Sequence, residues 1–268
     1  MSRRTAFRPL PDCATRLAAA VRGRNGPLLR HNHRSIAIAR VRCPLTEAAA
    51  LVFRSGSRTL SASWLSARSA VAAAVLAHGA GAGMSHPFMA GVADGLTAQG
   101  VSCLRFNFPY IEEGRRSPDR PPVLLESWRA ALGETARLAG ELPLVAGGKS
   151  LGGRMASMLA AEEGPRFRGR ALVFFGYPLH APGRVDQPRD SHLSAIRVPM
   201  LFIQGTADAL ANFGLVEELV ARLRPLAHLH VVPGGDHSFR VRGVRRPDLE
   251  IGRELGTVAG SFAQEAVP

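Results

Sequence analysis

The sequence is poor in several features that define common protein classes. Its three cysteines are too widely spaced for a disulfide framework or a zinc site. The longest uninterrupted apolar run, residues 70–77, is far shorter than the roughly 20 residues of a membrane-spanning helix. The arginine-rich start lacks the apolar core and small-residue cleavage site of a secretory signal peptide. These absences predict a cytoplasmic protein without a membrane span.

Acidic residues are nearly absent from the first 46 positions. Ten arginines and one acid, Asp12, lie there and account for nine of the thirteen net positive charges. The remaining residues, 47–268, are nearly balanced, so the high basicity does not indicate a nucleic-acid-binding domain. Because residues 1–46 show little apolar periodicity, we expect a weakly ordered, dispensable extension. The alternative is an arginine-rich arm that binds nucleic acid or an anionic membrane.

Residues 47–268 are long enough to bury a sizeable core and are patterned as one α/β domain. Two β-like runs, 49–53 and 59–65, are joined by Ser55-Gly56-Ser57 and predict a hairpin. Further apolar runs recur about every 30 to 40 residues with helix-like segments between most of them, as a parallel sheet with crossover helices requires. The predicted strands are 71–77, 101–106, 142–146, 171–175, 200–203 and 228–232, and the predicted helices are 87–98, 122–139, 151–163, 212–224 and 249–263.

The segment Gly148-Lys149-Ser150-Leu151-Gly152 matches G-x-S-x-G, the nucleophile elbow. This pattern holds a serine in a strained turn between a strand and a helix, and the glycines leave room for that backbone. The match is weak alone, but a strand-like run precedes it and a helix-like run follows it. A Walker A loop is the rival interpretation, and it is disfavoured because Pro143 stands where that loop needs glycine.

A serine nucleophile needs a general base and an acid that orients the base. Asp208 and His237 each follow a predicted strand. Because parallel strands open their carboxyl ends on one sheet edge, we expect both to converge with Ser150. The chain order Ser, Asp, His is that of α/β-hydrolases. The alternatives are that Asp208 caps a helix and that His237 is an exposed loop residue. Asp236 competes with Asp208 as the acid, although its side chain reaches the ring of the adjacent His237 poorly.

A glycine-rich loop, residues 78–83, follows another predicted strand. Small residues let backbone N–H groups approach a substrate, so we expect the N–H of Leu151 and one from Ala80 or Gly81 to form an oxyanion hole. A flexible turn or a dinucleotide-binding loop is the alternative. The latter is disfavoured because the third glycine of G-x-G-x-x-G is missing.

Residues beside these motifs are candidates for substrate binding. His78 begins the glycine-rich loop, and Lys149 precedes the predicted nucleophile. Arg184 lies with Arg189 in the segment 176–199, whose 24 residues are too short and too proline-rich for a lid domain. We therefore expect a shallow, basic mouth that favours short acyl groups and carboxylate-bearing ones. The alternative is that these arginines are solvated and indifferent to substrate.

Two His-x-His pairs are the remaining candidates for a metal site. They are His31/His33 and His228/His230, and neither has an acidic or cysteine partner at ligand spacing. Solvated side chains are expected, so the sequence predicts no metal and no cofactor.

Five blocks of sequence carry a family resemblance: HGAGAGM and HPFM at 78–84 and 86–89, RFNFPY at 105–110, GKSLGGR at 148–154, FGYPLH at 175–180 and GDHSF at 235–239. Together they resemble small bacterial α/β-hydrolases akin to dienelactone hydrolase, whose eukaryotic relatives include testis-expressed protein 30. The resemblance covers about residues 47 to 265 and implies catalytic Ser150, Asp208 and His237. Dienelactone hydrolase itself has cysteine where this chain has Ser150, so its lactone substrate is not carried over.

The sequence thus predicts an α/β-hydrolase fold, with a mostly parallel sheet, helices on both faces and no large lid domain. The expected activity is that of a serine hydrolase cleaving a small ester, thioester or lactone through an acyl-enzyme. The competing class is a non-catalytic interaction protein that retains the fold, against which the intact Ser, Asp and His set argues. The expected partner is a small-molecule substrate, with no nucleic acid for the body and no membrane, and the oligomeric state stays open.

Overall fold

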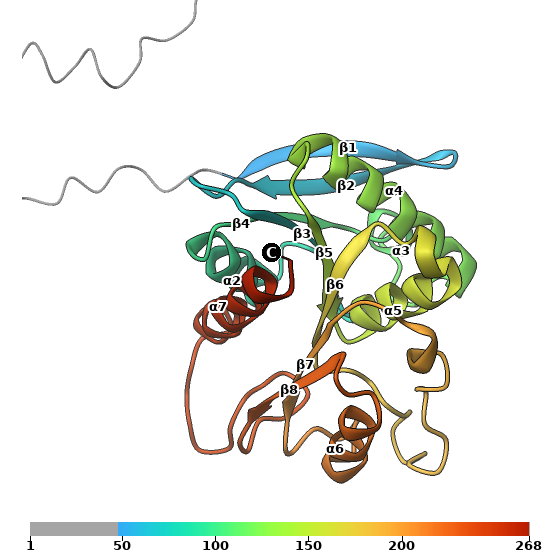
Figure 1. Cartoon of the computed structure of the whole chain (residues 1–268), viewed down its shortest axis with the longest axis vertical. Helices are drawn as coiled ribbons and strands as arrows, with labels where there is room; N and C mark the ends of the chain where they lie inside the picture. Colours follow the sequence, from blue (N-terminus) through green and yellow to red (C-terminus); the bar gives the residue numbers. More distant parts are fainter. Residues whose placement is uncertain (1–47, 268) are drawn as a thin grey trace, which may run out of the picture. The chain divides into compact units, whose positions relative to one another are not determined.

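The computed structural model describes residues 48–267, which form an eight-stranded sheet with helices on both faces (Figure 1). The expected extension, residues 1–46, lies outside this part of the chain. The strands are β1 (Ala49–Ser55), β2 (Arg58–Leu65), β3 (Ala72–Ala77), β4 (Val101–Phe106), β5 (Leu144–Lys149), β6 (Gly169–Phe175), β7 (Met200–Gly205) and β8 (Ala227–Val232). The helices are α2 (Pro87–Ala98), α3 (Pro109–Glu112), α4 (Pro121–Ala139), α5 (Leu151–Glu163), α6 (Phe213–Arg222) and α7 (Asp248–Ala266), with short 3-10 helices η1 (Gly164–Arg166) and η2 (Leu193–Ala195).

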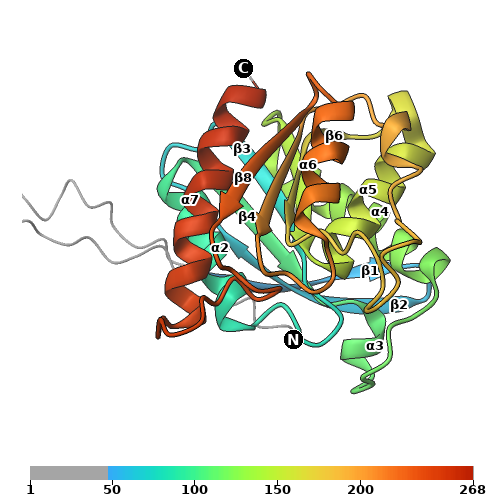
Figure 2. The same ribbon diagram turned by 90° about the horizontal axis from the view of Figure 1, so that it is seen from below.

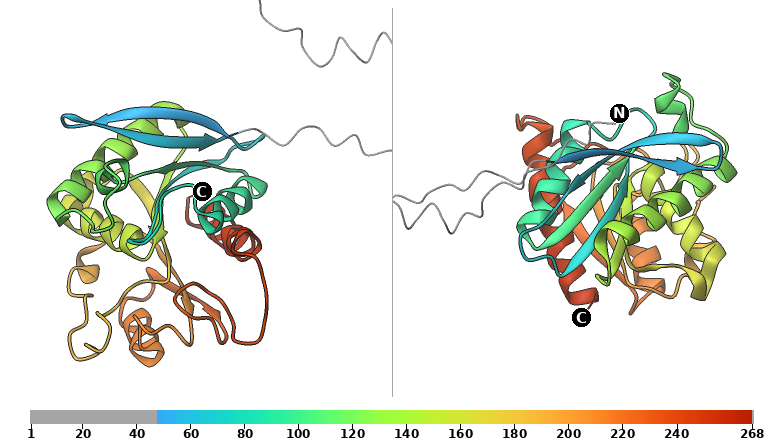
Figure 3. Two further views of the ribbon diagram at one scale, coloured as in Figure 1. Left: turned by 180° about the vertical axis from the view of Figure 1, so that it is seen from behind. Right: turned by 90° about the horizontal axis from the view of Figure 1, so that it is seen from above.

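The strand order is β1-β2-β4-β3-β5-β6-β7-β8. The predicted hairpin of β1 and β2 forms one edge, where β2 pairs antiparallel with β4 (Figure 3). All other neighbours, from β4 through β8, pair in parallel. The carboxyl ends of β3, β5, β7 and β8 therefore open on one edge of the sheet, and the segments predicted to carry the chemistry follow these four strands.

Helices cover both faces of the sheet (Figure 2), and a separate apolar cluster lies on each face. Helices α4, α5 and α6 pack on one face, with Trp128 and Met155 among the buried residues. Helices α2 and α7 pack on the other, with Val92 and Leu255 buried there. The predicted α/β class, with a mostly parallel sheet and helices on both faces, is confirmed.

All predicted strands and helices are present, with ends shifted by at most about three residues; two of the shifted ends and one unpredicted helix have local causes. Strand β5 continues to Lys149 rather than ending at 146, because its glycines pair with β3 and β6 although they extend no apolar run. Helix α6 ends at Arg222 rather than 224, because Pro225 disfavours the helical backbone conformation at the residue before it, Arg224. Helix α3, which begins at Pro109, was not predicted; its four residues are too few to show helical periodicity.

The segment 176–199 crosses the carboxyl edge of the sheet without forming a lid. Within it the only helical element is η2, a single 3-10 turn. Among the described residues, no helix is both long enough and apolar enough to cross a membrane.

Candidate active site

A sharp turn between β5 and α5 presents Ser150. Its backbone has φ 49° and ψ −112°, a left-handed conformation that a non-glycine residue rarely adopts. The Ser150 N–H donates a hydrogen bond to the Phe175 carbonyl at 3.1 Å, which holds the turn. A Cβ on Gly148 or Gly152 would overlap the Ala77 carbonyl oxygen. The glycines of G-x-S-x-G are thus required by the close approach of β3 to the turn.

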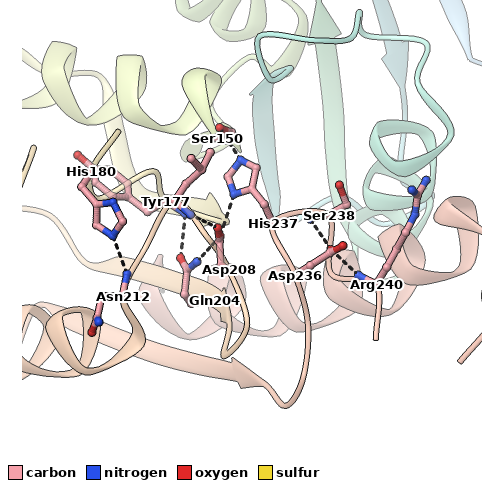
Figure 4. Close-up of polar contacts among 11 residues, drawn as sticks. Ser150, Tyr177, His180, Gln204, Asp208, Asn212, Asp236, His237, Ser238 and Arg240 are labelled. Atoms are coloured by element: carbon pink, nitrogen blue, oxygen red, sulfur yellow. Dashed lines mark hydrogen bonds and ion pairs between the residues drawn. The ribbon is translucent and has the colours of Figure 1, made fainter. Parts of the chain in front are cut away.

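Ser150, His237 and Asp208 form a continuous hydrogen-bonded chain (Figure 4). His237 Nε2 lies 2.9 Å from Ser150 Oγ, and His237 Nδ1 lies 2.8 Å from Asp208 Oδ2. Because an ionised carboxylate only accepts hydrogen bonds, Nδ1 carries the proton and Nε2 is left to accept one from the serine hydroxyl. The structure therefore brings together the three residues predicted from separate strand ends.

The Asp208 carboxylate is enclosed by donors. Its Oδ2 also accepts from Gln204 Nε2 at 2.6 Å, and its Oδ1 accepts from the Leu210 N–H at 2.8 Å. Burial raises the pKa of Asp208, but the hydrogen bond and charge of His237, the Leu210 N–H and the Lys149 ammonium together hold this pKa below its ordinary value. The carboxylate therefore stays ionised beside His237.

Gln204 is a supporting residue that sequence reasoning missed. Its Nε2 donates to Asp208, and its Oε1 accepts from the Tyr177 N–H at 2.9 Å, so the side chain ties the end of β7 to the residues that follow β6. The side chain is fully buried. The only signal in the sequence was one polar residue at the end of an apolar strand.

Asp236, the competing acid, faces a different group. Its exposed carboxylate accepts from the backbone N–H groups of Ser238 at 2.7 Å and Arg240 at 2.9 Å, and so closes its own loop (Figure 4). Its hydrogen bonds position the turn that carries His237 rather than the imidazole itself.

A cavity of about 390 Å³ opens beside Ser150. It is bordered by the glycine-rich loop, the start of α2 and the loop after β8. The residues that line it include Gly79, Ala80, Gly81, Phe88, Met89, Lys149, Ser150, Leu210, His237 and Arg240. A Cβ on Gly79 would lie 3.6 Å from Ser150 Cβ, so the loop packs against the serine. The Tyr110 hydroxyl donates to the Ala80 carbonyl at 3.1 Å and anchors this loop. Leu151 begins α5, so its N–H has no acceptor within the helix.

Two of the residues expected to bind substrate lie elsewhere. His78 is fully buried, its Nε2 accepts from the Phe108 N–H at 3.1 Å, and burial lowers its pKa to about 4. It supports the glycine-rich loop from behind instead of facing the cavity. Arg184 is exposed, donates to Gln187 Oε1 at 3.1 Å and does not line the cavity. The expected basic rim is therefore not formed by Arg184, because its segment turns that side chain to solvent.

Lys149 does border the cavity, but its ammonium does not face it. Nζ is buried, has no hydrogen-bond partner among the described residues, and lies 5.4 Å from the centre of the Phe239 ring. Burial lowers the pKa of Lys149 to about 8, against the opposing effect of the Asp208 and Asp236 carboxylates. The charge is thus placed to act on Asp208, not to contact a substrate directly.

A second serine and histidine pair lies inside the protein. Ser157 Oγ is 2.8 Å from His192 Nε2, but Ser157 is fully buried within α5 and donates to the Arg154 carbonyl. Within residues 48–267, no carboxylate accepts a hydrogen bond from His192. This pair lacks both the access and the orienting acid of the Ser150 site.

The described residues contain no group of three or more His, Cys, Asp or Glu side chains that could hold a metal ion. His228 and His230 both lie on β8, where His228 packs 5.6 Å from the Phe262 ring. His31 and His33 lie outside the described residues.

The parallel sheet, the strained serine turn and the Ser150–His237–Asp208 hydrogen bonds define an α/β hydrolase. The chain belongs to the family described as the alpha/beta hydrolase domain, whose model matches residues 70–262. The predicted resemblance to this superfamily is confirmed, and the protein is a hydrolase.

Solved structures share this fold at low sequence identity. The dienelactone hydrolase of Anabaena variabilis matches with a TM-score of 0.67 and 20% identity, over 84% of this chain and all of that one. A Xanthomonas campestris protein described as an α/β serine hydrolase without a lid matches with a TM-score of 0.62, 20% identity and coverage of 84% and 99%. The esterase domain of a Rhodothermus marinus protein matches with a TM-score of 0.61 and 18% identity, over 82% of this chain and 98% of that one.

Proposed function

We propose that this protein is a serine hydrolase that cleaves small esters, thioesters or lactones, with Ser150 as nucleophile, His237 as general base and Asp208 as the orienting acid. The observation that carries the proposal is the unbroken hydrogen-bond chain from Ser150 Oγ to Asp208 Oδ2, at 2.9 and 2.8 Å. A serine hydroxyl is a weak nucleophile until a base takes its proton, and this chain provides that base in the required tautomer.

Acylation begins when His237 Nε2 takes the Ser150 hydroxyl proton as Oγ attacks the substrate carbonyl carbon. The imidazolium that forms is stabilised by the Asp208 carboxylate, which stays ionised because Gln204 and Leu210 also donate to it. His237 then gives the proton to the leaving oxygen or sulfur, and the acyl-enzyme remains. Deacylation repeats these steps with water in place of Ser150.

The negative charge on the carbonyl oxygen needs fixed donors. The N–H of Leu151, at the start of α5, is one such donor, and Ala80 or Gly81 of the glycine-rich loop supplies the second. The packing of this loop against Ser150 supports the assignment, since both donors must reach the same oxygen.

A small substrate fits the surroundings of Ser150 best. The cavity holds about 390 Å³ and is open to solvent, and the only helical element of the segment 176–199 is the single 3-10 turn η2. A long acyl chain would find few apolar walls beyond Phe88, Met89 and Leu210. Two of the structural neighbours are named as a dienelactone hydrolase and an esterase domain, which agrees with an ester-like bond as target.

Covalent labelling tests the proposal. A fluorophosphonate probe should label the wild-type chain, and Ser150→Ala should abolish both labelling and hydrolysis of p-nitrophenyl acetate, with a loss on the order of 10⁶ in rate for removal of a triad nucleophile. Ser157→Ala is the matched control, since it removes the other hydroxyl bonded to a histidine and should leave labelling intact. Failure of the wild-type chain to react would favour a non-catalytic interaction protein.

A further inference from the structure

A second recess lies beside α5, lined by residues that do not border the active-site cavity. This groove measures about 520 Å³ and lies between α5 and the segment 176–199. Its lining includes Arg154, Met158, Ala161 and Glu162 from the helix and Arg189 and Ala195 from the segment. We call it the α5 groove. It combines two guanidinium groups with apolar walls.

The Arg154 side chain has one buried donor without an acceptor among the described residues. The residue is half-buried, its Nε is buried without a hydrogen-bond partner among the described residues, and burial lowers its pKa. Arg105 also has a buried free Nε, but its other nitrogens donate to Met84 and Ser63. In the described part of the chain, no carboxylate forms an ion pair with Arg154. A buried guanidinium N–H without an acceptor is costly unless a bound group supplies one.

Arg189 faces the same groove from the opposite wall. Its backbone is fixed, because its N–H donates to the Leu179 carbonyl and its own carbonyl accepts from the Tyr177 hydroxyl. Its guanidinium forms no ion pair with residues 48–267 either. Both side chains line the groove. Burial is the main cause of the lowered Arg154 pKa, and the positive charge of Arg189 lowers it further.

The acids near the groove are already engaged by other arginines. Glu162 lines the groove but pairs with Arg129 at 2.6 Å, and Asp190 pairs with Arg222 at 2.6 Å. Neither carboxylate neutralises the Arg154 and Arg189 side chains, so the groove keeps an excess of positive charge.

We propose that the α5 groove is an oxyanion-binding site, in which Arg154 and Arg189 hold a phosphate or carboxylate group of a small molecule. Guanidinium groups match the oxygen geometry of both anions and form bidentate hydrogen bonds with them. Met158, Ala161 and Ala195 provide an apolar wall for the rest of the molecule. The site shares α5 with the nucleophile turn but uses none of the proposed catalytic residues.

Calorimetric titration of the full chain with inorganic phosphate, at constant ionic strength, tests the proposal without requiring hydrolase activity. Saturable binding is expected, weakened at least about tenfold in both Arg154→Gln and Arg189→Gln, since a charge-assisted hydrogen bond contributes that much. Succinate in a parallel titration distinguishes the two anions, and stronger binding of either identifies the group that the site takes.

Arg170→Gln is the matched control, because it removes one exposed arginine from β6 outside the groove. Arg189 is exposed, so Arg189→Gln should fold normally even if Arg154→Gln does not. The proposal is overturned if phosphate and succinate show no saturable binding, if both groove variants bind as the wild type does, or if Arg170→Gln loses as much affinity as they do.

Discussion

Replacing Lys149 with methionine should stabilise the protein. Methionine has nearly the same length as lysine but carries no charge, and the Lys149 ammonium has no hydrogen bond to lose among the described residues. The change therefore removes the cost of a buried charge while the packing around Phe239 is kept.

The magnitude follows from the shift in the pKa of Lys149. A fall from 10.5 to about 8 corresponds, at 1.36 kcal/mol for each pH unit, to about 3 kcal/mol of destabilisation when the group is charged. Since the folded pKa is the lower one, this cost is present in full below about pH 8. It disappears between about pH 8 and 10.5 as the folded state releases its proton before the unfolded state does. Wild-type stability should therefore rise through this window relative to Lys149→Met.

Urea unfolding and thermal melts at pH 7 and pH 10 measure the effect. At pH 7 the variant should gain about 2 to 3 kcal/mol, or roughly 4–12 °C in Tm for a domain of this size. The gain should shrink at pH 10. Lys149→Arg is the control, because arginine stays charged throughout and should bring no gain at either pH. A Lys149→Met variant that is less stable than the wild type at pH 7, or whose gain does not depend on pH, would refute the reasoning.

Three further predictions concern activity and domain organisation. With p-nitrophenyl acetate as substrate, Asp208→Asn should lower kcat by a factor on the order of 10³ to 10⁴, whereas Asp236→Asn should lower it only mildly. A larger loss in Asp236→Asn than in Asp208→Asn would make Asp236 the orienting acid. Along a series of p-nitrophenyl esters, kcat/KM should peak at about two to four acyl carbons, because longer chains gain little without apolar walls; a maximum at about eight or more would disprove this. A chain shortened to begin at Glu47 should keep the Tm and esterase rate of the full chain, whereas a large loss in either, or salt-sensitive DNA binding by the full chain alone, would show that residues 1–46 contribute.

The sequence predicted the sheet and the position of the chemistry because both depend on local signals and simple topology. Each buried strand is a short apolar run, and parallel pairing brings the ends of distant strands to one edge. Ser150, Asp208 and His237 could therefore be grouped from the sequence. The G-x-S-x-G spacing also has a local cause, since the space beside Ala77 admits only glycine at positions 148 and 152.

Side-chain direction within loops could not be predicted in the same way. His78 and Arg184 both follow strand ends, yet one points into the core toward Phe108 and the other toward solvent. Which way a loop residue turns depends on its partners across the fold, and those partners are distant in sequence. The same applies to Gln204, whose role depends on Tyr177 and Asp208 meeting at neighbouring strand ends.

The energetic costs of this protein gather around the proposed nucleophile. Two described non-glycine residues have positive φ: Ser150, which lines the cavity, and Phe239, which stacks on the cavity residue Phe88. The Lys149 ammonium lies near the Phe239 ring and has no hydrogen-bond partner among the described residues. Lys149 is the single lysine of the chain, and the other 33 of its 34 lysine and arginine positions are arginine. At position 149 a residue that can release its proton tolerates burial better than one that cannot, because its charge can be relieved when the environment disfavours it. Strain and buried charge persist where surrounding structure compensates for them, and their concentration at one sheet edge agrees with a site selected for chemistry rather than for stability.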